Sequence, residues 1–169
     1  MPVSMTVPLT QGKVGLIDVV DAHLLAGYRW YTARAGKQWY MRGQRSRATV
    51  PRSQRRCIDF HRLLFPETKM VDHKNGNGLD NRRENIRPAT NSQNQLNRAK
   101  RQGCSSRYKG VAWHIKHERW ISNIRYQGRR IHLGWFFDEE SAARAYNEKA
   151  LELFGDFARL NIVPQEKEA

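Results

Sequence analysis

Apolar and polar residues alternate through three short segments in the C-terminal third of the chain. The alternation covers residues 111–116, 119–126 and 130–133, and Gln127-Gly128 supplies a turn between the last two segments. A period of two directs successive side chains to opposite faces of a sheet, so that one face is buried and the other solvated. The pattern therefore predicts three strands of one antiparallel sheet.

A helix is expected directly after these strands. Asp138 is a residue type that caps helix N-termini, and Gly155 suits the position just past a helix end. Between them, Ala142, Tyr146 and Ala150 recur at helical spacing. The expected product is a three-stranded antiparallel sheet with one amphipathic helix packed on its apolar face.

The charge of the chain predicts an anionic partner. Lys and Arg number 30 against 16 Asp and Glu, a formal charge of +14, and a chain this basic usually meets nucleic acid or an anionic membrane. A membrane is not expected, because no segment approaches the ~20 apolar residues of a spanning helix. The N-terminus has no basic head followed by an apolar stretch, so we expect a cytoplasmic protein rather than a secreted one.

The predicted sheet is basic and the predicted helix acidic. The face away from the helix should carry side chains suited to nucleic acid, since Arg and Asn make bidentate contacts with guanine and adenine edges. The polar residues expected there are His114, Arg119, Asn123, Arg125, Arg130 and His132.

This segment resembles the ethylene-response-factor type of DNA-binding domain. The motifs that carry the resemblance are Tyr108-Lys-Gly-Val111, Trp120-Ile-Ser-Asn-Ile-Arg125, Leu133-Gly-Trp-Phe136 and the stretch 140–161. In that family the sheet lies in the major groove of double-stranded DNA. The implied contacts are Lys109, His114, Arg119, Asn123, Arg125, Arg130 and His132. Three positions depart from the family's usual residues, namely Ala112, Asn123 and His132, which puts the preferred DNA sequence in doubt.

A second group of polar residues could carry chemistry. Asp72 and His73 are adjacent, and Asn85 and Asn94 follow them. Hydrolysis of a phosphodiester needs a base for the attacking water, which a neutral imidazole such as His73 can provide. Asp72 and Asn94 offer hard oxygen ligands for Mg²⁺, and Asn85 could fix the intervening loop. By spacing alone, an Asp-His pair is more often structural than catalytic.

The wider context of this pair is similar to HNH homing-type endonucleases of the ββα-metal fold. The similarity rests on Phe60-His-Arg-Leu-Leu64, Val71-Asp-His-Lys-Asn-Gly-Asn77, the stretch 79–87 and Thr90-Asn-Ser-Gln-Asn94. It implies His73 as general base, Asn85 as the structural middle residue, and Asp72 with Asn94 as ligands of a divalent metal, Mg²⁺ or Mn²⁺. Asn94 stands where many members have His.

The similarity extends to the N-terminal part through Pro8-Leu-Thr-Gln-Gly12, Ile17-Asp18 and Trp30-Tyr31, which resemble the lead-in of phage HNH proteins. A phage-encoded protein in a bacterial host is therefore expected. Short apolar segments in this part predict strands and hairpins. Their aromatic residues are expected to fill a small core rather than to stack on bases.

The predicted fold class is α+β. We expect a β-rich segment over 1–55, the nuclease core over 56–98, a basic linker over 99–106, the DNA-binding domain over 107–161 and a tail over 162–169. Within the core, Asn81–Asn85 is a candidate helix start and Thr90–Asn97 a candidate second helix.

The leading hypothesis is a metal-dependent endonuclease acting on double-stranded DNA, as a monomer and without a small-molecule substrate. No structural zinc is expected, because the two cysteines, Cys57 and Cys104, form no CxxC pair. Two alternatives stay open. One is a non-catalytic, sequence-specific DNA-binding regulator with a decayed nuclease core, and the other is an RNA-binding accessory protein.

Overall fold

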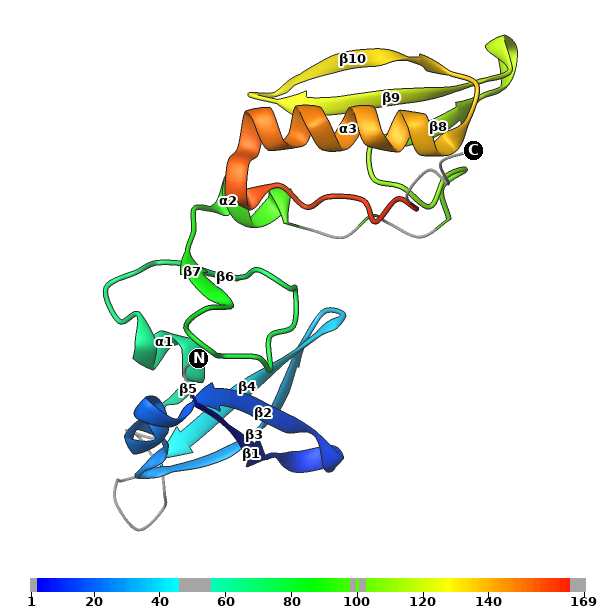
Figure 1. The fold of residues 1–169 in the computed structure, drawn as a ribbon. Coiled ribbons are helices and arrows are strands. Elements are labelled where there is room, and N and C mark those ends of the chain that lie inside the picture. Colours follow the sequence, from blue (N-terminus) through cyan, green and yellow to red (C-terminus); the bar gives the residue numbers. More distant parts are fainter. Residues whose placement is uncertain (1–2, 46–55, 98–99, 101–102, 165–169) are drawn as a thin grey trace. The chain divides into compact units, whose positions relative to one another are not determined.

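The computed structural model divides into two compact units, Met1–Asn94 and Gln95–Ala169 (Figure 1). It describes residues 3–45, 56–97, 100 and 103–164. Both units combine short helices with small antiparallel sheets, which confirms the predicted α+β class. No helix in these described stretches is long and apolar enough to cross a membrane.

The first unit is built from short strands joined by turns, as the short apolar segments of the N-terminal part predict. Its elements are β1 (Ser4–Pro8), η1 (Thr10–Gly12), β2 (Val14–Asp18), η2 (Val19–Leu25), β3 (Tyr28–Ala35), β4 (Gln38–Arg45), β5 (Cys57–Asp59), α1 (Phe60–Leu64), β6 (Val71–His73) and β7 (Ile86–Pro88). The strands pair as β1-β2, β3-β4-β5 and β6-β7. The helix α2 (Asn91–Leu96) follows β7 and runs across the boundary between the units.

One apolar core joins the parts of this unit. Ile17, Met41 and Phe60 are almost completely buried and pack with Leu64 and Ile86. Residues before and after position 55 therefore share a core, although they were predicted as separate segments. The predicted boundary itself falls in 46–55, outside the described residues.

The helix start expected at Asn81–Asn85 is wrong. Asn81 and Arg82 are irregular, residues 83–85 form a turn, and the chain then enters β7. Side chains in this stretch bond to nearby backbone groups, which competes with helix formation. Asn85 Nδ2 donates to the carbonyl oxygen of Asp80, and Asn81 Nδ2 donates to that of Leu79. The helix expected within Thr90–Asn97 is confirmed as α2.

The second unit is a three-stranded sheet covered by one helix. Its elements are β8 (Val111–His114), η4 (Ile115–His117), β9 (Arg119–Tyr126), β10 (Arg129–Phe136), α3 (Glu139–Phe154) and η5 (Gly155–Phe157), and the strand order is β10-β9-β8. The predicted helix N-cap is confirmed, because Asp138 accepts a hydrogen bond from Ser141 N at 2.7 Å.

Small residues let α3 approach the sheet closely. Ala142, Ala143 and Ala150 are completely buried, and Tyr146 packs with Ala150 and Ile124. A side chain at Gly110 would collide with the ring of Tyr146, since an added Cβ would lie 2.0 Å from Cδ2. Gly110 also has a φ of +81°, which L side chains rarely adopt.

Ile115 does not continue β8, contrary to the alternation. It opens the short helix η4 and is 84% exposed. The His114 side chain accepts a hydrogen bond from His117 N, and Glu118 closes the turn with a left-handed backbone. These local contacts end the strand at His114, two residues before the predicted end.

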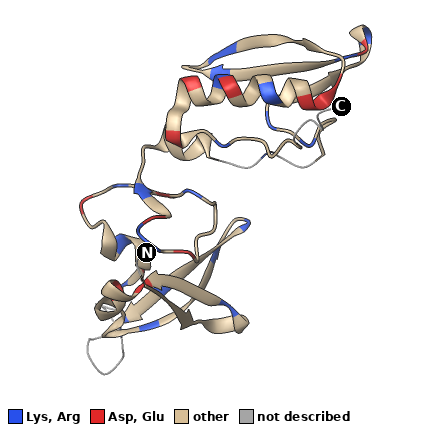
Figure 2. Ribbon diagram, viewed as in Figure 1, with Lys and Arg blue, Asp and Glu red and all other residues tan. Residues whose placement is uncertain are grey.

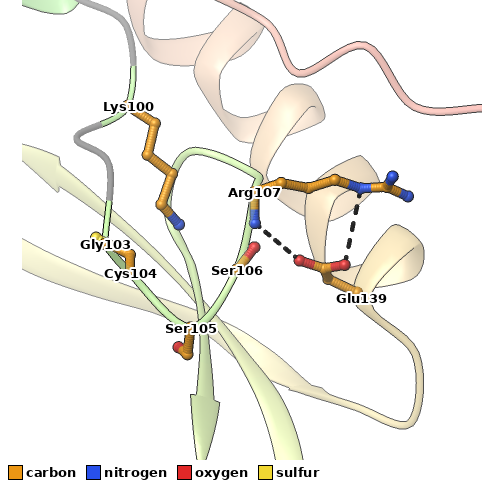
Figure 3. Close-up of a pocket in the computed structure, with 7 residues that line it drawn as sticks. All are labelled: Lys100, Gly103, Cys104, Ser105, Ser106, Arg107 and Glu139. Carbon is orange, nitrogen blue, oxygen red and sulfur yellow. Dashed lines mark hydrogen bonds and ion pairs between the residues drawn. The ribbon is translucent and has the colours of Figure 1, made fainter.

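The described part of the predicted linker packs against the second unit. Lys100 Nζ donates to the carbonyl oxygen of Val111 at 2.8 Å, and Ser105 Oγ accepts from Trp113 N at 3.0 Å. Figure 3 shows Lys100 and Ser105 lining a pocket beside Arg107, which bonds to Glu139 through its backbone N and side chain. This end of the linker is therefore ordered by contacts with the sheet and α3.

Candidate functional site

Asp72 and His73 occupy the short strand β6 and are both buried. The strand pairs antiparallel with β7, which sets Asp72 opposite Arg87 and His73 opposite Ile86. β6, β7 and α2 follow one another along the chain, so a strand-strand-helix order carries the predicted residues. Asn94 lies on α2 and is half-buried.

The loop between β6 and β7 is held by Asn85. Its Oδ1 accepts from Asn75 N at 3.0 Å, and its Nδ2 donates to the carbonyl oxygen of Asp80 at 2.7 Å. Both bonds go to backbone groups, so one buried side chain fixes two points of the loop. Gly78 lets the same loop pass close to β4, because an added Cβ would lie 2.5 Å from the carbonyl oxygen of Trp39.

The loop is also tied to the N-terminal strands. Asn81 N donates to the carbonyl oxygen of Leu16 at 2.7 Å. Arg83 donates to both carboxylate oxygens of Asp21, at 2.9 and 2.7 Å, and its backbone N donates to Asp18 at 2.8 Å. The N-terminal segment therefore supports the candidate site directly.

His73 is surrounded by rings and amides rather than by solvent. The centroid of its ring is 5.3 Å from that of His61 and 6.1 Å from that of Tyr40. Its Nε2 lies 3.3 Å from Asn81 Oδ1. Burial lowers the pKa of His73, so the imidazole is neutral near pH 7, which is the form that a general base needs.

His61 shares this environment. Burial is the main cause that lowers its pKa to about 4, and the neighbouring His73 adds to the effect. Two neutral imidazoles thus lie side by side in the interior of the unit. The ring of Tyr40 stands at 6.1 Å from His61 as well, and burial raises the pKa of that phenol.

Asp72 is oriented by an ion pair. Arg87 Nε and Nη2 both contact Oδ2 of the carboxylate, at 3.0 and 2.7 Å, and both side chains are largely buried. Asp72 and Asn94 together offer a carboxylate and an amide oxygen, which fits a hard divalent cation such as Mg²⁺ by donor chemistry.

The second unit presents a polar sheet face opposite α3, here called the open face. Ser122 and Ile124 of β9 point toward the helix and are buried, so the alternate residues of β9 face the other way. The strand register then places these residues on the open face: Ala112, His114, Arg119, Ile121, Asn123, Arg125, Arg130, His132 and Trp135.

The open face carries no acidic residue among these positions, whereas α3 is acidic. Figure 2 shows most acidic residues of this unit along α3, where Glu139, Glu140, Glu148 and Glu152 outnumber the basic Arg144 and Lys149. The two sides of the unit therefore differ in the sign of their charge. A surface that only needs solvation usually mixes both signs.

Comparison with known proteins finds a family match in the central segment of the chain. Residues 65–96 match the family described as HNH endonuclease. This match spans β6, the loop, β7 and α2, and it includes Asp72, His73, Asn85 and Asn94. The predicted nuclease enzyme is thereby confirmed.

Two relatives extend the comparison beyond the HNH segment. An uncharacterized HNH endonuclease of Acanthamoeba polyphaga mimivirus is 29% identical over 162 residues, which cover 90% of this chain and 77% of the viral protein. An AP2-like ethylene-responsive transcription factor of Arabidopsis thaliana is 39% identical over 59 residues, or 35% of this chain and 12% of the plant protein. No solved structure matches the chain significantly.

The structure groups most of the predicted site residues. Asp72, His73 and Asn85 lie at the ends of the loop 74–85 between β6 and β7, here called the HNH loop, and Asn94 follows on α2. Of the predicted DNA contacts, only Lys109 lies off the open face. Its Nζ donates to the carbonyl oxygen of Leu96, and burial lowers the pKa of this amine to about 8.

Two residues near these sites were not predicted to have a role. Asn81 contacts His73 from within the HNH loop, and Trp135 lies on the open face. Gly134 could have indicated the position of Trp135. A glycine within a strand pattern often marks a β-bulge, and a bulge moves the residues that follow it to the opposite face of the sheet.

Proposed function

We propose that this chain is a divalent-metal-dependent HNH endonuclease of the homing type, which hydrolyses phosphodiester bonds in double-stranded DNA. The observation that carries the proposal is the buried Asp72-His73 pair on β6, beside a loop that Asn85 fixes, inside the HNH match. HNH nucleases generally use divalent metal ions.

Each residue has a distinct task in this proposal. His73 accepts a proton from the attacking water, whose oxygen bonds to phosphorus while the bond to the leaving ester oxygen breaks. Asp72 and Asn94 hold the cation, and Arg87 keeps the Asp72 carboxylate in place. When bound, the cation supplies positive charge to the phosphorane and assists ionisation of water. Asn85 keeps the loop closed around these groups.

The open face binds the target in the same proposal. Its arginines, Arg119, Arg125 and Arg130, would contact phosphates and guanine edges. The partial match to a plant ethylene-responsive factor supports this role, and so does the absence of acidic residues from the face. Lys109 remains a proposed contact only if its amine leaves the carbonyl of Leu96 on binding.

Relaxation of a supercoiled plasmid tests the function. We expect nicked or linear product with Mg²⁺ or Mn²⁺, and none with EDTA. Binding to a labelled duplex, measured in the same buffers, should persist in EDTA because the open face needs no metal. A chain that binds the duplex yet leaves the plasmid intact with every divalent metal would instead be a DNA-binding regulator with a decayed nuclease core.

A further inference from the structure

A cluster of four rings occupies the open face around Trp135. The centroid of the indole lies 4.9 Å from that of His114, 4.8 Å from that of His117 and 5.3 Å from that of His132. These neighbours come from β8, η4 and β10. Trp135 remains 44% exposed, so its neighbours support the indole without covering it.

A bulge in β10 places the indole on this face. The register shifts between His132 and Gly134, so that Trp135 pairs with Ile121 while His132 pairs with Asn123. Ile121 and Asn123 lie two residues apart on β9 and share a face. Without the bulge, Trp135 would point toward α3. Gly134 adopts a φ of +140°, a conformation that glycine accepts at little cost.

The sheet face that carries the indole is basic. Arg119, Arg125 and Arg130 belong to the same face, and the register places no carboxylate there. A single exposed apolar side chain is common on a solvated surface, but this indole is held by three imidazoles on a face whose strand positions include no acidic residue. Against DNA it supplies an apolar surface between cationic groups that neutralise phosphates. In the major groove the apolar group that distinguishes one base pair from the others is the C5-methyl of thymine.

We propose that Trp135, supported by His114, His117 and His132, recognises a thymine methyl group in the major groove of double-stranded DNA. This inference rests on the proposed function, because it takes the open face as the DNA-binding surface. It assigns sequence preference to the ring cluster and general affinity to the arginines.

The test uses the full chain with His73→Ala, which blocks cleavage, to select bound duplexes from a random-sequence pool. Each thymine of the selected duplex is then replaced singly by deoxyuridine, which lacks only the methyl group. We expect one position to weaken binding about fourfold, as for loss of a buried methyl-sized group. The Trp135→Ala variant should bind the selected duplex more weakly and show no response to deoxyuridine at that position.

Trp113→Ala is the matched control. Trp113 is exposed to a similar degree, 39%, but packs on Trp120 on the other side of the sheet, so this variant should keep the deoxyuridine response. If deoxyuridine at no thymine of the selected duplex weakens binding by the His73→Ala chain, the inference is overturned whether or not the Trp135 variant folds. A preference for single strands or RNA would overturn it as well.

The inference and the proposed function fail differently. If the chain selects duplexes and Arg125→Ala weakens binding, but deoxyuridine has no effect, DNA binding by the open face stands and the role of Trp135 falls. If the parent chain binds no duplex even at low salt, both fall together.

Discussion

The HNH loop and the open face hold their functional residues in opposite ways. The loop is held by buried side chains that bond to groups far away in the sequence, as the Asp21 carboxylate does to the side chain of Arg83 across 62 positions. On the open face, side chains project from a regular sheet into solvent. Under the proposed function, we therefore expect cleavage to depend on a few exact positions and binding to be spread over many replaceable contacts.

Substitution of Gly110 should have the largest effect, and it should be confined to the second unit. Gly110→Ala combines a left-handed backbone with a clash against Tyr146, so we expect the free energy of unfolding of this unit to drop by more than about 3 kcal/mol. Urea unfolding followed by tryptophan fluorescence measures this. Gly128→Ala is the control, because it has the same kind of backbone but no atom within 4 Å. Equal losses in the two variants would contradict the packing argument.

Substitution of Asn85 should separate the two activities. Asn85→Ala removes both bonds that fix the HNH loop, so we expect cleavage to slow by about 10²-fold, as for a misplaced catalytic group. Duplex binding, measured by gel shift, should change less than about twofold, since each neutral bond contributes only about 1 kcal/mol to stability and the open face is untouched. Loss of binding and cleavage in parallel would show that the two are not separable.

The buried histidines should make the first unit sensitive to acid. The folded-state pKa of His61 is about 4, while that of an unfolded histidine is about 6.5. Between these values the unfolded chain binds more protons, so the free energy of unfolding falls as the pH decreases. The contribution of His61 is about 2 kcal/mol between pH 7 and pH 5. Urea titrations at pH 7 and pH 5 measure the change in the free energy of unfolding between the two pH values. This change should be about 2 kcal/mol smaller in His61→Gln than in the parent chain. An equal change in the two proteins would contradict the burial argument.

The smallest effect is expected for single arginines of the open face. Arg125→Ala should reduce the slope of log K against log salt by about 0.9, the value for one phosphate contact. Lys149→Ala on α3 is the control, because Lys149 already pairs with Glu152 and lies on the acidic side. Binding titrations at several salt concentrations measure both slopes. Equal changes in the two variants would show that total charge, and not the open face, governs binding.

The regular unit was far more predictable from sequence than the loop-rich one. Alternation and capping residues identified β9, β10 and α3, because in these elements the facing of each side chain follows from local periodicity. The failures came where local contacts interrupt that periodicity. The bulge before Gly134 turned Trp135 outward, and a hydrogen bond at His114 ended β8 before Ile115.

In the first unit, the sequence motifs identified the candidate site residues but not the contacts that hold them in place. Asp72, His73 and Asn85 were selected through resemblance, and the structure brings them to the ends of one loop. The contacts that hold this loop could not be predicted, because they join Asp18 and Asp21 to Arg83 across more than sixty positions. No local pattern in a single sequence reports such a pairing. The same applies to the approach of His61 to His73.

The central claim is that one chain cuts DNA through His73 while binding it through a separate surface. The most direct test compares His73→Ala with His23→Ala, an exposed histidine in the same unit, by plasmid relaxation with Mg²⁺ and by gel shift on the same preparations. We expect His73→Ala to lose cleavage by about 10³-fold, as for a general base, and to keep duplex binding within about twofold, while His23→Ala matches the parent. A His73→Ala protein that relaxes the plasmid at the parent rate would contradict the account.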